Sequence, residues 1–510
     1  MIDQNVKNLV MRIVSMAVSF ISTMIITYIV VDYIGNELYG FYQMSNDIIN
    51  YATVITVALN SMSSRFITIS YIQEDFDDAS KYYNSVLFGN IVLAVALAIP
   101  SSVFILVLDK LIDVPDVYLH DVKILFVLMF INFFVTICSS VLSTATFVKN
   151  RIDLDSYRTI ERELIRVIIV YIICKFLSPH IWCVGVSILA STIFACIRNY
   201  CYTLKLVPEI KLFKKEFFDI GRIKELVQSG LWNSLTQLGQ ILRNGLDLII
   251  ANQMIGSMAM GTLSVAKTLP KYLLAAMTAV ASVFTPKIMI AYAEGNKEKL
   301  VSIIYTSIKV CALISICIEV IIIVLSRRLY ILWISGQDSY TLSLLTIVSM
   351  FGYVVLMPMQ VLWAVFTATN RVKVSSLYLL AESILAILAV FWLLKTTDNA
   401  LIKMVIIAGV SSVFELIRGL TFLPAVSAGL LDIKLRTFYK PLFRSLIAFG
   451  FSVFVSLMVN KLPIHSSWSG FALLCFIDIL LTLIVCVFVL FDRNEIHFVL
   501  RMFKIKRGEK

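Results

Sequence analysis

The apolar residues of this chain are gathered in blocks of about 20 or more, which is the length that a helix needs to cross a bilayer. Hydrophobic residues make up 59% of the sequence and charged residues only 15%. A soluble protein carries about 25% charged residues, because polar side chains must cover its surface. This pattern excludes a soluble globular enzyme and a disordered chain, and it predicts an all-α polytopic membrane protein.

Hydropathy divides the chain into about 14 predicted transmembrane helices joined by short loops. The expected spans are 10–31, 45–70, 84–108, 122–148, 164–179, 182–203, 228–252, 259–290, 301–326, 340–368, 374–395, 401–424, 440–460 and 468–491. The loops leave no room for an extramembrane domain.

Basic residues outside these spans predict the orientation of the chain. The sequence has 44 Lys and Arg against 33 Asp and Glu, a formal charge of +11. With the N-terminus in the cytoplasm, cytoplasmic loops hold about 30 of these cations and the opposite side about 8. Both termini are therefore expected in the cytoplasm. The excess charge indicates topology, and no nucleic-acid partner is expected.

The longest connection, residues 204–227, mixes apolar side chains with lysines at roughly helical spacing. This composition predicts an amphipathic cytoplasmic helix on the membrane surface. It would divide the chain into four parts: an N-terminal lobe of helices 1–6 (1–203), the linker (204–227), a C-terminal lobe of helices 7–12 (228–424), and two extra helices with a basic cytoplasmic tail (425–510).

Two glycine motifs indicate that the lobes are repeats of each other. Ile34-Gly35-x4-Gly40 follows the first predicted helix, and Ile255-Gly256-x4-Gly261 follows the seventh, 221 residues later. At the same shift, small residues coincide in the next helix of each lobe, namely Ala58 with Ala279 and Ser61 with Ser282. Corresponding helices would run in the same direction, so we expect a parallel pseudo-repeat about an axis along the membrane normal.

The seventh predicted helix carries a stripe of polar residues at spacings of 4, 3, 4 and 3, which places them on one face. These residues are Asn233, Gln237, Gln240, Asn244 and Asp247, with Arg243 beside them. A stripe this polar is too costly to face lipid, since a charged residue at mid-membrane costs roughly 2.5–3.5 kcal/mol. It is expected to face a water-filled cavity or a polar partner helix.

Three further cations in predicted spans are candidate substrate contacts. Lys267 and Lys271 stand on one face of the eighth helix, where Pro270 is expected to kink it. They either line a path for an anionic substrate or extend to the outer interface. Arg65 ends a polar cluster in the second helix and is either a substrate contact or an interfacial anchor.

The sequence lacks the signatures of an enzyme. It contains no P-loop, no HExxH, no GxSxG and no GxGxxG motif. The nine cysteines form no CxxC pair, and they are typical of buried apolar residues rather than of a metal site. We therefore expect no catalytic residue, no cofactor and no bound metal other than a coupling ion.

Taken together, several stretches resemble the polysaccharide flippases of the multidrug/oligosaccharidyl-lipid/polysaccharide exporter superfamily. The resemblance covers the helix layout of the whole chain, and its loose motifs are Tyr33-Ile34-Gly35-x4-Gly40, Ala58–Phe66 (ALNSMSSRF), Gly245–Ala251 (GLDLIIA) with Ile255-Gly256, and Ala368–Lys373 (ATNRVK).

This resemblance implies two six-helix bundles around a central cavity, with two additional C-terminal helices. It also implies alternating-access transport of an undecaprenyl-diphosphate-linked oligosaccharide across the bacterial inner membrane, for O-antigen and lipopolysaccharide, capsule or exopolysaccharide. We expect a monomer that contacts membrane lipids and works with a polysaccharide polymerase and export machinery. Coupling to Na⁺ or H⁺ is expected.

Chemistry assigns a role to each candidate residue. A diphosphate binds Lys and Arg, and sugar hydroxyls bind amides. Arg243, Lys267 and Lys271 are therefore expected to contact phosphate, with Arg65 as an entry contact. The amides Asn233, Gln237, Gln240 and Asn244 would contact sugar. Asp247 would pair with Arg243 or bind the coupling cation.

Two alternatives remain open. A multidrug or cation antiporter of the same superfamily is expected to have an acidic residue in its first helix or an acidic cavity, whereas no acidic residue lies between Arg12 and Val31. A membrane polymerase or acyltransferase is expected to have a large periplasmic loop or an intramembrane histidine. The sequence disfavours both alternatives.

Overall fold

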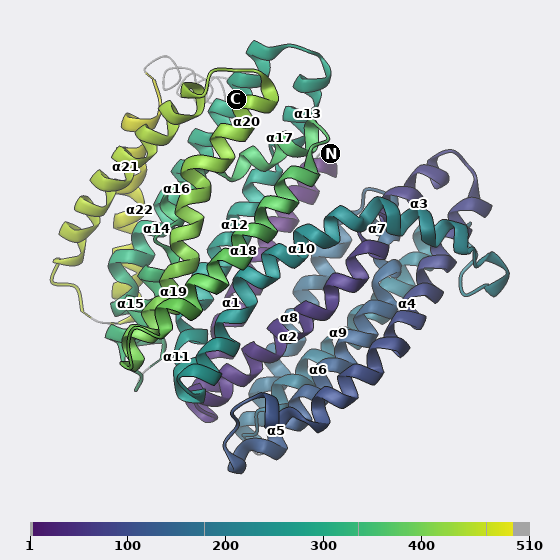
Figure 1. Cartoon of the computed structure of the whole chain (residues 1–510), viewed down its shortest axis with the longest axis horizontal. Coiled ribbons are helices and arrows are strands. Elements are labelled where there is room, and N and C mark those ends of the chain that lie inside the picture. Colours follow the sequence, from purple (N-terminus) through teal and green to yellow (C-terminus); the bar gives the residue numbers. More distant parts are fainter. Residues whose placement is uncertain (1–3, 178, 335, 466, 493–510) are drawn as a thin grey trace, which may run out of the picture. The chain divides into compact units, whose positions relative to one another are not determined.

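The computed structural model describes residues 4–177, 179–334, 336–465 and 467–492, apart from the side chains of residues 5, 6, 9, 243 and 244. Within this part of the chain the regular structure is entirely helical, which confirms the predicted all-α class. The chain forms two compact units: Met1–Val265 with Ser376–Ile387, and Ala266–Ser375 with Leu388–Lys510 (Figure 1).

The first unit contains the helices between Gln4 and Ala266. They are α1 (Gln4–Tyr33), α2 (Asn36–Asn60), α3 (Ser63–Ile72), α4 (Phe76–Leu106), α5 (Leu108–Leu111), α6 (Leu119–Ser139), α7 (Thr144–Val148), α8 (Ile152–Phe176), α9 (Trp182–Leu206), α10 (Ile220–Met254) and α11 (Ser257–Ala266). Short 3₁₀ turns occur at Asp116–Tyr118, Ser140–Ser143 and Lys215–Phe217.

The second unit begins where α11 ends. Its helices are α12 (Thr268–Ser282), α13 (Thr285–Ala293), α14 (Lys297–Trp333), α15 (Ser339–Met350), α16 (Tyr353–Met359), α17 (Trp363–Ala368), α19 (Ala400–Ile417), α20 (Leu423–Leu431), α21 (Arg436–Asn460) and α22 (Trp468–Leu490). The ends of α18 (Val372–Leu394) also belong to it, whereas Ser376–Ile387 belong to the first unit. A π-helical turn, Arg418–Phe422, joins α19 to α20.

Every predicted span falls on a helix or on a group of consecutive helices. In the described residues, 10 helices are long and apolar enough to cross a membrane, and a bent pair, Ser339–Met350 with Tyr353–Ala368, raises the number to 11. The remaining predicted spans fall on α2 with α3, on α8 and on α10, which do not pass the same test of length and hydropathy. The count of 14 spans therefore stays a prediction, and three helix groups stand out as polar.

The prediction of one amphipathic helix over residues 204–227 is wrong. Helix α9 ends at Leu206, residues 207–219 contain only a 3₁₀ turn, and α10 begins at Ile220. Pro208 opposes continuation of the helix, because proline disfavours a helical conformation at the preceding residue. The backbone of this segment is instead hydrogen-bonded by side chains of α4.

The glycine motifs adopt the same backbone conformation in both places. Gly35 has φ +105° and Gly256 has φ +128°, a region that glycine enters at little cost. Each of the two residues directly precedes a helix, α2 or α11. A Cβ atom added to Gly40 would lie 2.9 Å from Cα of Gly261, so the second glycines of the two motifs pack directly against each other within the first unit.

The repeat extends well beyond these motifs. Glu74 and Gly295, again 221 residues apart, both have positive φ, and the next residues, Asp75 and Asn296, cap α4 and α14. Further along, Asn150 and Asn370 have φ 51° and 55° before α8 and α18, at a shift of 220 residues. The turns and caps thus support the predicted parallel pseudo-repeat.

The eighth predicted span is interrupted where the prediction placed a kink. Helix α11 ends at Ala266 and α12 begins at Thr268. Pro270 has no backbone N–H to donate to the Ala266 carbonyl, which leaves that oxygen without its intrahelical partner. The Thr346 hydroxyl of α15 donates to it instead, at 3.0 Å. The break is therefore a stabilised feature of the second unit.

Candidate functional site

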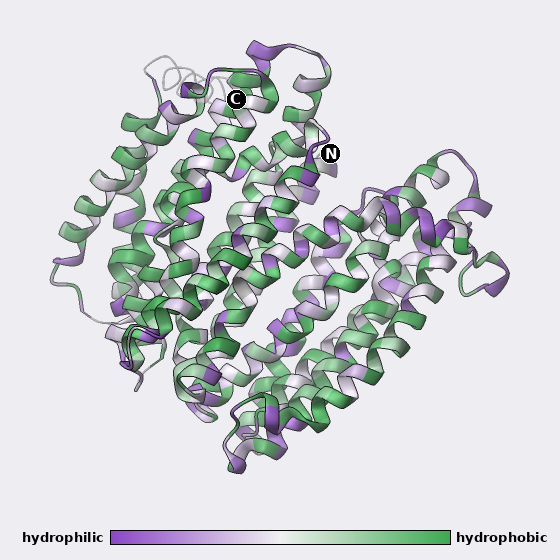
Figure 2. Ribbon diagram, in the orientation of Figure 1, coloured by the Kyte–Doolittle hydropathy of each residue, from purple (hydrophilic) through white to green (hydrophobic). Residues whose placement is uncertain are grey.

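The polar stripe on α10 lies in the first unit, as one row of residues along the helix. Asp247 is buried, Asn233 and Gln237 are half-buried, and Gln240 is exposed. The predictions for Arg243 and Asn244 fall outside the described side chains. Figure 2 shows hydrophilic residues at intervals along α10, in contrast to the mostly hydrophobic α6.

One side of α10 packs closely against α2. A Cβ atom on Gly230 would lie 2.1 Å from the Ala58 carbonyl oxygen, so only glycine allows this approach. A Cβ atom on Gly245 would lie 3.1 Å from the Tyr51 hydroxyl. The Asn233 amide donates to the Ser61 hydroxyl at 3.2 Å. The α10 stripe is thereby connected to the polar end of α2.

The other side of α10 contacts Ser376–Ile387. The Thr236 and Ser376 hydroxyls lie 2.6 Å apart, and the Ser383 hydroxyl donates to the Gly239 carbonyl at 2.6 Å. On a helical wheel the amide stripe falls between this contact face and the α2 contact face. This placement explains why Gln240 is exposed although α10 packs on both sides.

A second polar row lies on α8, and the sequence prediction missed it. Arg158, Arg162 and Arg166 are four residues apart and so share one face. The prediction began this span at residue 164 and assigned the preceding arginines to a cytoplasmic loop. In the structure α8 begins at Ile152. The regular spacing of the three arginines was the available signal.

Ion pairs and hydrogen bonds hold these arginines in place. Glu163 is 4% exposed and pairs with Arg162 at 2.9 Å and with Arg166 at 3.5 Å. Arg166 also donates to the Tyr42 hydroxyl of α2 and lies 5.9 Å from the centre of its ring. The Arg162 side chain is the most exposed of the three, at 41%.

Helix α2 thus contacts both polar rows, at opposite ends: Ser61, directly after its last residue, contacts the amides of α10, and Tyr42, near its start, contacts the arginines of α8. Its own surface continues the polar character, since Asn50 is exposed. Helices α2, α8 and α10 are also the ones too polar to pass as membrane spans. Because polar groups are costly in lipid, this surface of the first unit is best explained by contact with water or a polar ligand.

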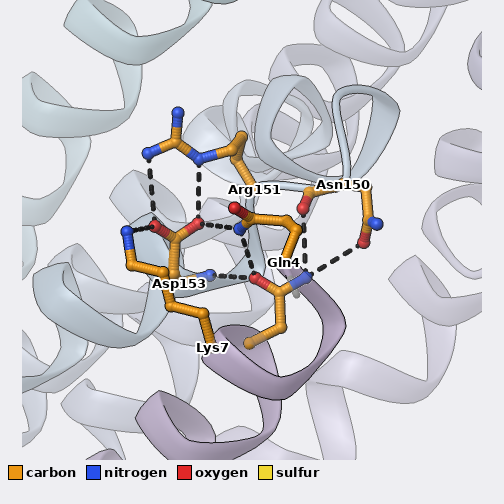
Figure 3. Close-up of polar contacts among 6 residues, drawn as sticks. Gln4, Lys7, Asn150, Arg151 and Asp153 are labelled. Atoms are coloured by element: carbon orange, nitrogen blue, oxygen red, sulfur yellow. Dashed lines mark hydrogen bonds and ion pairs between the residues drawn. The ribbon is translucent and has the colours of Figure 1, made fainter. Parts of the chain in front are cut away.

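The start of α8 is tied to α1 by a buried network (Figure 3). Asp153 has 0% exposure and accepts from Arg151 at 2.9 Å, Lys7 at 2.9 Å and Gln4 at 3.0 Å. The Asn8 amide donates to the Asn150 carbonyl at 3.0 Å, and its oxygen accepts from the Asp153 backbone N–H at 3.0 Å.

The charges of this network determine the ionisation of Asp153. Burial raises the pKa of its carboxyl, but hydrogen bonds and charge interactions with Arg151 and Lys7 outweigh burial and lower it to about 2. The carboxylate is therefore ionised at neutral pH. It fixes the first turn of α8, and with it the direction in which the arginine row extends.

The remaining predicted residues lie elsewhere. Arg65 is exposed on α3, while its neighbour Asn60 turns inward and exchanges hydrogen bonds of 2.9 Å with Asn90. Lys267 is half-buried at the α11–α12 break and Lys271 is exposed on α12, both in the second unit. In the part of the chain that the structure describes, no group of three or more His, Cys, Asp or Glu residues is arranged to hold a metal ion.

The sequence matches the family described as polysaccharide biosynthesis protein over residues 6–289, more than half of the chain. The protein belongs to this family. It is also 25% identical over 362 residues to the uncharacterized membrane protein EpsK of Bacillus subtilis (strain 168), an alignment that covers 70% of this chain and 71% of EpsK.

Solved structures share the fold. An inward-facing multidrug resistance MATE family transporter of the MOP superfamily superposes with a TM-score of 0.67 at 15% identity, covering 81% of this chain and 96% of that one. The lipid II flippase MurJ in an inward closed conformation gives a TM-score of 0.66 at 13% identity, covering 94% and 98%. The protein is a multi-span membrane protein with the fold of MOP-superfamily flippases and transporters.

Proposed function

We propose that the protein is a flippase that carries an undecaprenyl-diphosphate-linked oligosaccharide from the cytoplasmic to the outer leaflet of the bacterial inner membrane. The oligosaccharide would then serve surface polysaccharide synthesis, as O-antigen, capsule or exopolysaccharide. A polymerase and an export machinery would act on it afterwards. Transport would proceed by alternating access.

The observation that carries this proposal is the polar surface formed by α8, α2 and α10. One row consists of three arginines, of which Arg162 is the most exposed at 41%, and the other row consists of amides, both within one unit. A lipid-linked sugar has the same two kinds of polar group, a diphosphate and many hydroxyls. Moving such a headgroup through lipid without replacing its water is prohibitively costly, and a polar protein surface lowers that cost.

Within this proposal, Arg158, Arg162 and Arg166 contact the diphosphate, a role that the sequence alone did not predict. The amides Asn233, Gln237, Gln240 and Asn244 contact sugar hydroxyls. We retain Arg243, Lys267 and Lys271 as further phosphate contacts and Arg65 as an entry contact.

Transport against a gradient needs an energy source, and a cation gradient is the one we propose. Na⁺ or H⁺ would bind at Asp247, which is buried at 4% exposure and is the C-terminal residue of the α10 stripe. The alternative role of Asp247, a pair with Arg243, involves a side chain outside those described. Replacing Asp247 by Asn distinguishes the two, because only the coupling role changes the dependence of transport on the ion gradient.

The direct test is leaflet translocation in reconstituted vesicles. Purified protein is incorporated into liposomes that contain an undecaprenyl-diphosphate-linked oligosaccharide, and a sugar-modifying enzyme outside the vesicles reports which molecules reach the outer leaflet. We expect protein-dependent exposure of the molecules that began in the inner leaflet.

The same vesicles test the antiporter alternative. Vesicles that accumulate or release organic cations in response to a Na⁺ or H⁺ gradient, without translocating the lipid-linked sugar, would contradict the proposal. A cation antiporter would require acidic contacts for its substrate, whereas the α8 row presents arginines.

A further inference from the structure

The second unit has a groove beside the first turns of α14, which we call the α14 groove. Its volume is about 480 Å³, and it is lined by Lys297, Glu298, Val301, Ser302, Tyr305, Thr306 and Ile433. At one end Lys297 pairs with Asp432 at 2.9 Å. None of the residues assigned to transport above lines the groove.

The repeat places this groove at the position that is equivalent to a site on α4 in the first unit. In the first unit, the chain between α9 and α10 covers that site. A shift of 221 residues places Glu298, Val301, Tyr305 and Thr306 at the positions of Asp77, Ser80, Asn84 and Ser85 of α4. Those α4 residues are the ones that bind the linker between α9 and α10.

The α4 contacts are specific. The Ser80 hydroxyl accepts from the Lys211 backbone N–H at 3.0 Å, and Asn84 accepts from the Lys214 N–H at 2.8 Å while donating to the Lys211 carbonyl at 2.7 Å. Ser85 accepts from the Asp219 N–H at 2.9 Å. The Lys211 side chain pairs with Asp77 at 3.0 Å.

Burial shows the difference between the two sites. Ser80, Asn84 and Ser85 each have 0% exposure beneath the linker, whereas Ser302 and Thr306 of the α14 groove are exposed. The lengths of the two connecting segments explain this difference in burial. Residues 207–219 cross the end of α4 before α10 begins, but only residues 432–435 separate α20 from α21.

The chain after α22 starts beside the open groove. Asp492 pairs with Arg444 at 3.0 Å and with Lys309 at 3.6 Å. The Lys309 ammonium lies 4.8 Å from the centre of the Tyr305 ring, and Tyr305 lines the groove. Asp492 is therefore anchored to Lys309, which lies about one helical turn of α14 from the groove residue Tyr305.

The residues after Asp492 have the composition that the linker has. Residues 208–219 combine apolar side chains with basic ones, as in Ile210, Lys211, Leu212, Phe213 and Lys214. Residues 493–510 repeat this mixture in Leu500, Arg501, Met502, Phe503, Lys504, Ile505 and Lys506. An extended chain covers about 3.3 Å per residue, so reaching the groove from Asp492 requires only a few residues.

We propose that residues 493–510 dock in the α14 groove and cover the first turns of α14, as the linker covers the first turns of α4. Apolar side chains of this segment would fill the space beside Val301 and Tyr305. A lysine or arginine would pair with Glu298, which occupies the position of Asp77. The C-terminal segment would then have the same role in the second unit that the linker has in the first.

Cysteine labelling of the full chain in nanodiscs tests this proposal. In a background with exposed Cys201 replaced by Ser, maleimide reactivity is measured for Thr306→Cys and for its repeat equivalent Ser85→Cys. Removing residues 493–510 should accelerate labelling at Thr306→Cys about tenfold and leave Ser85→Cys slow, because the linker still covers it. Equal rates at Thr306→Cys with and without the segment would overturn the proposal.

A photo-crosslinking amino acid at Phe503 of the otherwise complete chain provides a second test that does not depend on truncation. Crosslinks to residues 297–306 or to Ile433 support docking, and crosslinks confined to lipid or to other segments overturn it. Both measurements are repeated in zwitterionic and anionic nanodiscs. Protection of Thr306→Cys that requires anionic lipid would mean that the basic segment binds the membrane surface instead, and would also overturn the proposal.

Discussion

Helices α8 and α18 occupy equivalent places in the repeat but differ sharply in chemistry. Both follow an Asn-Arg pair whose Asn has positive φ, at a shift of 220 residues. Where α8 has Arg158, Arg162 and Arg166, α18 has Tyr378, Glu382 and Ala386. Helix α18 is apolar enough to span a membrane by itself, and α8 is not.

Helices α1 and α10 are also equivalent in the repeat and differ in the same way. Here the polar helix, α10, is the one from the second half of the repeat. Gln237 and Asp247 of α10 stand where α1 has Met16 and Ile26. The shared caps, glycines and breaks therefore belong to the scaffold, whereas the arginine and amide rows occur in only one member of each pair. This asymmetry is one argument for the substrate contacts that we propose for α8 and α10.

The largest effect is expected from removing the arginine row. Replacing Arg158, Arg162 and Arg166 by Gln, together with Glu163→Gln so that no buried carboxylate loses its partners, should lower the translocation rate about 1000-fold. Three charge-assisted contacts at about 1.5 kcal/mol each, with 1.36 kcal/mol per tenfold in rate, account for this magnitude. Initial rates in proteoliposomes measure it.

The matched control retains the charges. Replacing the same three arginines by Lys should lower the translocation rate only about tenfold. Lysine keeps the positive charge but lacks the planar, two-pronged geometry of a guanidinium. If the Gln variant inserts, unfolds at the wild-type temperature and transports normally, the α8 row does not contact substrate.

The next largest effect concerns the anchor of α8. Asp153→Asn removes the charge that holds Lys7 and Arg151, and should lower the free energy of unfolding by about 2–3 kcal/mol, as measured by thermal unfolding in detergent. The equivalent position in α18 is Lys373, which is exposed. Lys373→Asn should change the free energy of unfolding by less than about 0.5 kcal/mol. Equal effects would show that the anchor is not specific to α8.

Acid should remove the same stabilisation. The pKa of Asp153 falls from the ordinary 3.8 to about 2 in the folded protein. A lowered folded-state pKa stabilises the fold above the unfolded pKa, and the contribution is lost as the pH falls from about 4 through 2. The difference in melting temperature between the wild type and Asp153→Asn should therefore be full at pH 7 and shrink toward pH 2. A constant difference would contradict the assigned ionisation.

A smaller and symmetric effect is expected at the shared turns. A Cβ on Gly35 or on Gly256 meets no atom within 4 Å, so backbone strain is the main cost of either Gly→Ala change. Each should destabilise the fold by about 1–2 kcal/mol. Gly450→Ala on α21 also meets no atom, at an ordinary φ, and should be neutral or slightly stabilising. Very different effects at Gly35 and Gly256 would weaken the structural repeat.

The smallest effect is expected from making α10 resemble α1. Gln237→Met introduces the residue that α1 has at this position and should lower the transport rate about fivefold, the equivalent of one lost hydrogen bond of about 1 kcal/mol. Ser19→Ala on α1 should leave the rate unchanged. Transport affected more by Ser19→Ala than by Gln237→Met would reverse the proposed roles of the two helices.

Much of the fold could be predicted because it depends on local patterns. Apolar length located the helices, and the shift between Gly35 and Gly256 indicated a repeat that the caps at Asp75 and Asn296 then extended. The α10 stripe was visible because helical periodicity places its amides on one face.

The remaining features depend on contacts that hydropathy does not detect. Arg158 and Arg162 were assigned to a loop because a hydropathy window ends where charge begins, although a helix does not have to end there. The linker was predicted as a helix because its apolar and basic residues have roughly helical spacing, although Pro208 disfavours a helix there. Its true conformation is determined by Ser80, Asn84 and Ser85, more than 120 residues earlier in the chain.

The central claim is that the arginine row of α8 contacts the diphosphate of the substrate. The direct test compares translocation of two lipids that carry the same oligosaccharide, one through a diphosphate and one through a monophosphate, by the wild type and by Arg162→Gln. The account predicts that the wild type prefers the diphosphate and that Arg162→Gln moves the rate ratio toward one. An unchanged ratio in a folded Arg162→Gln variant would contradict it.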